Sequence, residues 1–232
     1  MTVAAEPEKL SVTVGDLGNV TALLYYAAKR GRAGTTIILG HGAGANQMSK
    51  FMRLFAAGLA ARGFDTMTFN FLYSERGRGG PDPKAKLESC WMAVIEAARQ
   101  QRTLKGNRLV LGGKSMGGRI ASQVAAAGAG DIAALVFLGY PLHPPGNPEK
   151  LRDEHLPDVK APMLFIQGSR DAFGTPEEIS SVVKKRKLRG TTIHIIEGGD
   201  HSLAVPKSAG VPQDQLYEKI MDFIASWLQE QI

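Results

Sequence analysis

The chain has 232 residues, of which 44% are hydrophobic and 22% are charged. This composition is that of an ordinary folded protein and excludes a disordered chain. The one cysteine, Cys90, excludes both an intramolecular disulfide and a zinc site built from cysteines. We expect a single domain over residues 1–232, because strands and helices alternate regularly along the whole chain.

Charge and targeting signals argue against several classes of partner. The net charge is +6, and basic residues cluster at 29–32 and 184–189. Neither cluster is interleaved with aromatic residues or belongs to a nucleic-acid motif, so we interpret both as solvated surface and expect no nucleic-acid partner. Residues 6–9 carry charges where a signal peptide needs an apolar core, and no later run reaches membrane-spanning length. We therefore expect a cytoplasmic protein without a membrane partner, and the sequence gives no signal for an oligomeric state.

Short apolar runs alternate with segments of helical periodicity. The predicted strands cover residues 10–14, 20–28, 35–39, 65–71, 108–111, 133–138, 163–167 and 191–197. The predicted helices cover residues 48–62, 84–104, 116–127, 176–186 and 213–231. The first two strands form a hairpin around a turn at 15–18, and Gly/Pro-rich loops are predicted at 72–83 and 141–157.

This order predicts an α/β fold, with a mostly parallel central sheet covered by helices on both faces. The insertion between the strands at 133–138 and 163–167 is too short for a cap domain. The pocket should then be shallow and open, formed by loops at the carboxyl ends of the strands.

The centre of the pattern is Ser115. Residues 113–117 are Gly-Lys-Ser-Met-Gly, which fits G-x-S-x-G, and they lie between a predicted strand and a predicted helix. That motif predicts a sharp turn that exposes the serine hydroxyl as a nucleophile. An alternative is a glycine-rich turn whose serine only caps the helix. A phosphate loop is a weaker alternative, because its motif requires glycine where this chain has Arg108.

An acid and a histidine follow at later strand ends. Asp171 lies in the loop directly after the strand at 163–167, 56 residues beyond Ser115. His201 lies in the loop directly after the strand at 191–197, 30 residues beyond Asp171. Parallel strands bring such loops to one edge of the sheet, so His201 is predicted to accept the serine proton and Asp171 to orient the imidazole. The alternatives are that Asp171 only shapes a turn and that His201 is an ordinary surface residue. Asp200 is the competing acid, and His194 is the competing histidine.

The backbone N–H groups of Ala43 and Met116 are predicted to form the oxyanion hole. Residues 40–45 also fit a dinucleotide-binding motif, but the next strand ends without the acid that would hold a ribose. No metal and no cofactor is expected. The candidate substrate-binding residues are His41, Arg76, Lys114 and His143. A separate prediction is that four basic residues near the site favour a substrate with an acidic acyl or leaving group, namely Arg76, Arg78, Lys114 and Arg119.

These motifs resemble the α/β-hydrolase superfamily. The resemblance covers residues 20–230 and rests on His-Gly-Ala-Gly at 41–44, Gly-Gly-Lys-Ser-Met-Gly-Gly-Arg at 112–119, Gly-Ser-Arg-Asp at 168–171 and Gly-Gly-Asp-His at 198–201. Within the superfamily the chain resembles the dienelactone-hydrolase-like group that includes small bacterial hydrolases related to testis-expressed protein 30 and the non-specific-lethal complex subunit 3. The marks of that group are residues 112–119, Phe-Asn-Phe at 69–71, Arg-Gly-Arg at 76–78 and Pro-Asp at 81–82.

The resemblance implies a serine hydrolase with the triad Ser115, Asp171 and His201. Dienelactone hydrolases proper use a cysteine nucleophile, and this chain has serine at that position. We therefore expect a hydrolase that cleaves carboxylic esters or thioesters of small molecules through an acyl-enzyme. The alternative is an interaction module that keeps the fold without catalysis, because the resemblance includes relatives that look like scaffolding subunits.

Overall fold

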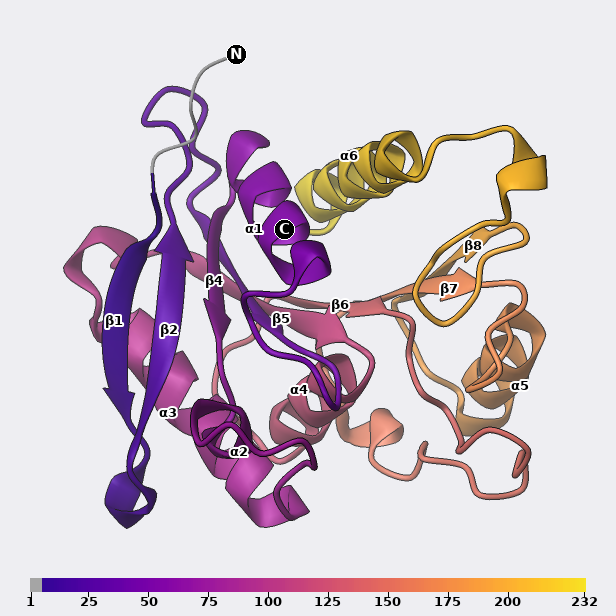
Figure 1. Cartoon of the computed structure of the whole chain (residues 1–232), viewed down its shortest axis with the longest axis horizontal. Coiled ribbons are helices and arrows are strands. Elements are labelled where there is room, and N and C mark those ends of the chain that lie inside the picture. The colour runs from indigo at the N-terminus through magenta and orange to yellow at the C-terminus, as the bar shows by residue number, and fades with distance from the viewer. Residues whose placement is uncertain (1–5) are drawn as a thin grey trace.

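A computed structural model describes residues 6–232 (Figure 1). Within this range eight strands form one sheet in the order β1-β2-β4-β3-β5-β6-β7-β8. Their bounds are β1 Glu8–Thr13, β2 Asn19–Tyr25, β3 Thr35–Gly40, β4 Asp65–Phe69, β5 Arg108–Lys114, β6 Ala134–Leu138, β7 Met163–Gly168 and β8 Thr191–Ile196. β2 runs antiparallel to β1 and β4, and the neighbouring strands from β4 to β8 are parallel. The predicted hairpin and the mostly parallel sheet are confirmed.

Helices cover both faces of the sheet. Their bounds are α1 Lys50–Ala61, α2 Leu72–Glu75, α3 Lys84–Gln100, α4 Met116–Ala126, α5 Pro176–Arg186 and α6 Gln213–Gln231. In Figure 1, α1 and α6 lie above the sheet, and α3, α4 and α5 lie below it. None of the helices between residues 6 and 232 combines the length and the apolar content that a bilayer span requires.

The central strands are buried on both faces, as their continuous apolar runs predict. In β3, Ile37 packs in the core under α1 and α6, and its neighbour Ile38 packs in the core under α3 and α4. Both side chains are fully buried, and each contributes about 1.5–3 kcal/mol to stability. This double anchoring fixes the central strands and hence the loops at their ends.

The region predicted as a loop at 72–83 begins with the short helix α2. Leu72 and Tyr73 are buried in the core, and Glu75 accepts a hydrogen bond from the backbone N–H of Thr21 at 2.7 Å. These tertiary contacts stabilise a helical turn at 72–75. The sequence did not predict this turn, because the glycines and prolines that follow it are typical of a loop. The helix predicted at 84–104 ends at Gln100 and is followed by a separate 3-10 turn, Arg102–Leu104.

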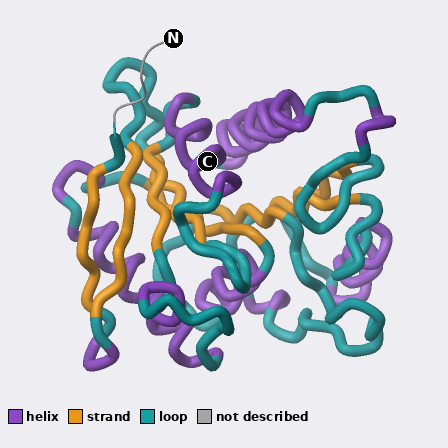
Figure 2. The backbone as a smooth tube through the Cα atoms, viewed as in Figure 1, coloured by secondary structure: helices purple, strands orange, loops and turns teal. Residues whose placement is uncertain are grey.

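The segment between β6 and β7 adds no domain over the strand ends. Its regular structure is a single 3-10 turn, Leu156–Asp158, and Figure 2 shows the rest of it as loop. Within the described residues this segment therefore contains no cap domain, as its length predicted.

Candidate active site

Ser115 occupies a strained turn between β5 and α4. Its backbone has φ 49° and ψ −117°, a left-handed φ that costs about 1–3 kcal/mol in a residue with a Cβ. Gly113 and Gly117 allow this turn, because a Cβ on either would collide with the Gly40 carbonyl oxygen. The Ser115 side chain makes no capping bond to α4. The alternative of a simple helix-capping serine therefore does not describe this turn.

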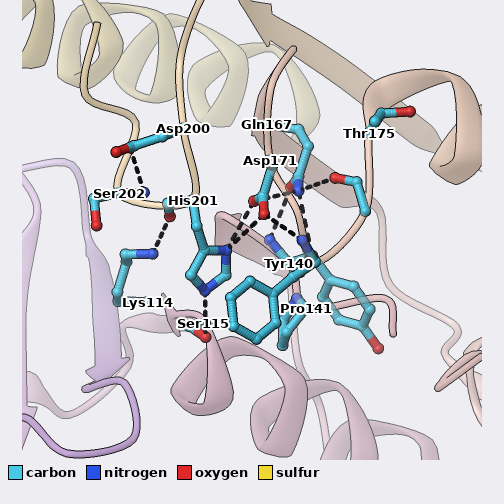
Figure 3. Close-up of polar contacts among 12 residues, drawn as sticks. Lys114, Ser115, Tyr140, Pro141, Gln167, Asp171, Thr175, Asp200, His201 and Ser202 are labelled. Carbon is cyan, nitrogen blue, oxygen red and sulfur yellow. Dashed lines mark hydrogen bonds and ion pairs between the residues drawn. The ribbon is translucent and has the colours of Figure 1, made fainter. Parts of the chain in front are cut away.

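The hydroxyl of Ser115 contacts His201, and His201 contacts Asp171 (Figure 3). The Ser115 Oγ to His201 Nε2 distance is 2.7 Å. His201 Nδ1 lies 2.8 Å from Asp171 Oδ2 and 3.0 Å from Oδ1. With the imidazole proton on Nδ1, that nitrogen donates to the carboxylate and Nε2 is free to accept the serine proton. The predicted convergence of three strand ends is therefore present in the geometry.

Asp171 is buried, and neighbouring donors satisfy its oxygens. The side-chain amide of Gln167 donates to Oδ2 at 2.8 Å, and the backbone N–H of Phe173 donates to Oδ1 at 2.8 Å. The same Gln167 accepts a bond from the backbone N–H of Tyr140 at 2.8 Å. A carboxylate held from several sides keeps a fixed orientation toward His201.

Two further side chains hold the His201 loop. The Phe173 ring stacks on the imidazole with 4.1 Å between ring centres. The ammonium of Lys114 donates to the backbone carbonyl of His201, as Figure 3 shows. Burial lowers the pKa of Lys114 to about 8, because a low-dielectric site disfavours the charged amine.

Ser115 lies at the boundary of two cavities. The larger one measures about 640 Å³ and includes His201 and Lys114. Its walls are mainly apolar side chains from α1, α6 and the Asp171 loop, namely Phe51, Met52, Leu54, Tyr217 and Phe173. The smaller one measures about 310 Å³ and includes charged residues, among them Arg119 and Arg152.

The two predicted oxyanion donors border these cavities. Ala43 lines both of them, and Met116 lines the smaller one. Met116 is the first residue of α4, so its N–H has no acceptor within the helix. Ala43 and Met116 thus each line a cavity that Ser115 also lines.

Residues 33–229 match the family described as alpha/beta hydrolase domain. The chain belongs to this family. The match covers most of the sequence, including the Ser115 turn and the loops that carry Asp171 and His201.

Solved structures share the fold of this α/β hydrolase at low sequence identity. A dienelactone hydrolase from Anabaena variabilis has a TM-score of 0.74 and 20% identity over 98% of this chain and 100% of its own. An α/β serine hydrolase without a lid from Xanthomonas campestris has a TM-score of 0.71 and 20% identity, covering 99% and 94%. An esterase from Pyrococcus furiosus has a TM-score of 0.74 and 16% identity, covering 97% and 90%. The likeness shows a common fold.

Three of the predicted substrate-binding residues of this α/β hydrolase lie outside both cavities. His41 is fully buried and bonds the backbone of Gly42 and Phe71. Arg76 donates to the carbonyl oxygen of Leu17 at 2.6 Å. His143 is buried and bonds Pro144 and Glu178. Each of these side chains has partners within the fold, and Lys114 is the one of the four predicted residues that lines a cavity at Ser115.

The sequence did not predict the contacts of Gln167, Phe173 and Arg152 at this site. Gln167 lies at the end of a buried apolar strand, and a polar side chain at such a position could have indicated a buried hydrogen-bonding role. Phe173 is two residues after Asp171, but nothing in the sequence marks it as a partner of His201. Arg152 is in the predicted Pro-rich loop, far in sequence from the other cavity residues.

The rival residues lie elsewhere or have other contacts. Asp200 accepts bonds from the backbone N–H groups of Ser202 and Ala204 and so shapes its own loop. His194 stacks on Phe223 from α6, within β8. In residues 6–232 no group of three His, Cys, Asp or Glu side chains is arranged to hold a metal ion.

A larger hollow of about 890 Å³ opens near the amino ends of β5, β6 and β7. Its walls include Arg108, Ala133 and Pro162, and no serine, cysteine or histidine lines it. It lies at the opposite edge of the sheet from the loops that carry Ser115, Asp171 and His201, so the smaller cavities at Ser115 are the better candidate for chemistry.

Proposed function

We propose that this chain is a serine hydrolase that cleaves carboxylic esters or thioesters of small molecules through an acyl-enzyme. The observation that carries the proposal is the continuous contact from Ser115 Oγ to His201 at 2.7 Å and from His201 to Asp171 at 2.8 Å. A serine hydroxyl is a weak nucleophile at neutral pH, so it needs a base at hydrogen-bond distance. The family match and an esterase among the structural neighbours agree with this class of reaction.

In the first half-reaction, Ser115 Oγ forms a bond to the substrate carbonyl carbon while its proton moves to His201 Nε2. The leaving oxygen or sulfur departs with that proton as the carbonyl re-forms, which leaves an acyl-serine. In the second half-reaction, water adds to the acyl carbon, gives a proton to Nε2 and releases the acid. His201 returns this proton to Ser115, so the cycle needs no cofactor.

Ala43 and Met116 are proposed to donate their backbone N–H groups to the oxyanion that forms in both halves. Removing one such donor typically costs about 10²–10³ in kcat. Asp171 is a positioning residue in this scheme, since it touches the imidazole and not the substrate. Buried polar partners around it support that role.

A thiol nucleophile is a poor alternative. Cys90 is buried in α3, and burial raises the pKa of its thiol to about 11. Because the thiolate is the reactive form, such a cysteine is inert at neutral pH. We also propose that the chain belongs with the relatives of testis-expressed protein 30 and the non-specific-lethal complex subunit 3, on the motifs at 69–82 and 112–119.

Turnover of 4-nitrophenyl acetate tests the proposal. Ser115→Ala is expected to lose several orders of magnitude in kcat, because loss of the serine nucleophile in a triad costs about 10⁶. Ser181→Ala, an exposed serine on α5, is the matched control and should keep the wild-type rate. Equal rates for Ser115→Ala and the wild type would remove Ser115 from the mechanism.

The alternative is an interaction module that keeps the hydrolase fold without catalysis. A fluorophosphonate probe separates the two, because it reacts with an activated serine and not with an ordinary hydroxyl. Labelling of the wild type and not of Ser115→Ala supports the hydrolase. An unlabelled wild type would favour the interaction module.

A further inference from the structure

The smaller cavity beside Ser115 is rich in positive charge. It measures about 310 Å³ and lies between the start of α4, the loop before α3 and the loop after β6. Its charged lining residues are Arg119, Arg152, Lys84 and Asp82. The larger cavity at the same serine has more apolar surface, and its charged lining residues are Lys50, Lys114 and Asp214, of which Lys50 and Asp214 form an ion pair with each other.

Arg119 is placed to reach a substrate held at Ser115. Its backbone N–H donates to the Ser115 carbonyl oxygen at 3.1 Å, one helical turn further along α4. Side chains in a helix tilt toward its N-terminus, so the guanidinium extends over the turn that begins at Ser115. It is partly buried, and its Nε has no hydrogen-bond partner.

Arg152 brings a second guanidinium to the same cavity. Among the described residues, the Arg152 side chain donates one hydrogen bond, to the Pro141 carbonyl oxygen at 3.3 Å. Burial lowers the pKa of Arg119, and the positive charge of Arg152 lowers it further. Within residues 6–232, neither guanidinium forms an ion pair with a carboxylate. Glu88 and Asp82 are the nearby carboxylates, but neither pairs with these guanidinium groups. Two neighbouring cations outside any ion pair are an unfavourable arrangement that an anion would relieve.

The remaining charges leave this positive character in place. Lys84 pairs with Glu88 at 3.3 Å. Asp82 is the one acidic residue that lines the cavity, and its Oδ2 is buried without a partner. A single carboxylate therefore faces two unpaired guanidinium groups, and the cavity retains a net positive charge.

We propose that Arg119 and Arg152 bind a carboxylate at the far end of the acyl chain, so that the substrates are monoesters or monothioesters of short dicarboxylic acids. This inference rests on the proposed function, because it names the acyl group that Ser115 accepts. Guanidinium groups suit carboxylates because their paired N–H donors match the two oxygens.

The position of His201 decides which part of the substrate enters which cavity. His201 must protonate the leaving group, and it lines the larger cavity and not the smaller one. The leaving group therefore enters the larger apolar cavity, and the acyl chain extends toward Arg119. Because Arg119 is one helical turn from Ser115, a short acyl chain is enough to bring a terminal carboxylate toward it.

The test compares two 4-nitrophenyl esters of equal acyl length, the hemiadipate and the hexanoate. The wild type should prefer the charged ester in kcat/KM by about tenfold or more, and less so at high salt. Arg119→Gln and Arg152→Gln should each lower this preference by about tenfold. Since the preference is a ratio measured on one sample, partial misfolding of a variant does not change it.

Arg78→Gln is the matched control. Arg78 is exposed, lies in the loop after α2 and lines neither cavity, so the same change of charge should leave the preference unaltered. Asp82→Asn should raise the preference, because it removes the opposing carboxylate.

Unchanged preference in both Arg119→Gln and Arg152→Gln, with Ser115-dependent turnover of the hexanoate, would overturn this inference and leave the proposed function intact. A charge preference found instead on the leaving group, with 4-carboxyphenyl hexanoate against phenyl hexanoate, would overturn the assignment of the cavities. If neither ester is cleaved and fluorophosphonate does not label Ser115, the proposed function fails and this inference fails with it.

Discussion

Gln167 Nε2 donates a hydrogen bond to Asp171 Oδ2 over 2.8 Å, where β7 ends. The same nitrogen lies 2.7 Å from the Gly174 carbonyl oxygen, and Oε1 accepts from the Tyr140 backbone N–H. One buried amide thus joins the end of β6 to the loop that carries the acid. The Gln167 amide and the Phe173 backbone N–H together fix the orientation of Asp171.

Changing Gln167 should lower kcat without touching the substrate. Gln167→Met removes the donor to Asp171 and leaves buried backbone groups without partners, at about 1–3 kcal/mol of unfolding free energy. Gln167→Glu keeps the size but places a second carboxylate beside Asp171, so its kcat for 4-nitrophenyl acetate should fall further than that of Gln167→Met. Unfolding in urea controls for stability, and equal kcat in the wild type and both variants would contradict a role in positioning Asp171.

The buried His41 should make stability depend on pH. Its Nε2 accepts from the Phe71 backbone N–H at 3.3 Å, and its Nδ1 bonds the Gly42 carbonyl oxygen. Burial lowers its pKa to about 4. Between about pH 6.5 and pH 4 the unfolded chain binds a proton at this histidine and the folded chain does not.

The free energy of unfolding should therefore fall as pH drops through this window, by about 3 kcal/mol from His41 in full. Urea unfolding across the window should show a smaller pH dependence for His41→Asn than for the wild type. Burial and the nearby Arg119 also lower the pKa of His155 to about 4, so His155→Asn should reduce the dependence in the same direction. Parallel curves for His41→Asn and the wild type would refute the assignment.

The glycine after the predicted nucleophile should tolerate no side chain. A Cβ on Gly117 would collide with backbone atoms of Gly40 and His41, and backbone moves less readily than a flexible side chain. Gly117→Ala is expected to lower the unfolding free energy by about 1–3 kcal/mol and to displace Ser115. Gly79→Ala, where a Cβ meets nothing within 4 Å, is the control. A Gly117→Ala protein with wild-type stability and rate would show that the turn has more room than the structure gives it.

Much of the fold was predictable because its signals are local. Apolar runs such as residues 35–39 mark strands buried on both faces, and glycines around Ser115 mark a turn too tight for side chains. The contact between Ser115, Asp171 and His201 followed from the rule that parallel strands end at one edge. The short helix α2 did not follow, because it depends on the burial of Leu72 and Tyr73 against distant elements.

Closeness in sequence to the catalytic motifs did not predict which side chains line the cavities at Ser115. His41 directly precedes the predicted oxyanion loop, yet its ring faces the core and bonds the backbone. Arg76 is three residues after a buried tyrosine, but its side chain turns to the hairpin at Leu17. Arg152 reaches the cavity from a loop whose path the sequence does not determine. Side-chain direction in irregular segments depends on tertiary packing, which no local pattern encodes.

The most direct test is the detection of the acyl-enzyme itself. Protein mixed with 4-nitrophenyl acetate and quenched in acid during turnover should carry one acetyl group, located by mass spectrometry on Ser115. His201→Asn should not accumulate it, whereas Asp200→Asn should, because Asp200 shapes its own loop and does not contact the imidazole. Turnover without an acetyl group on Ser115 in any quenched sample, or equal acetylation in His201→Asn, would contradict the proposed mechanism.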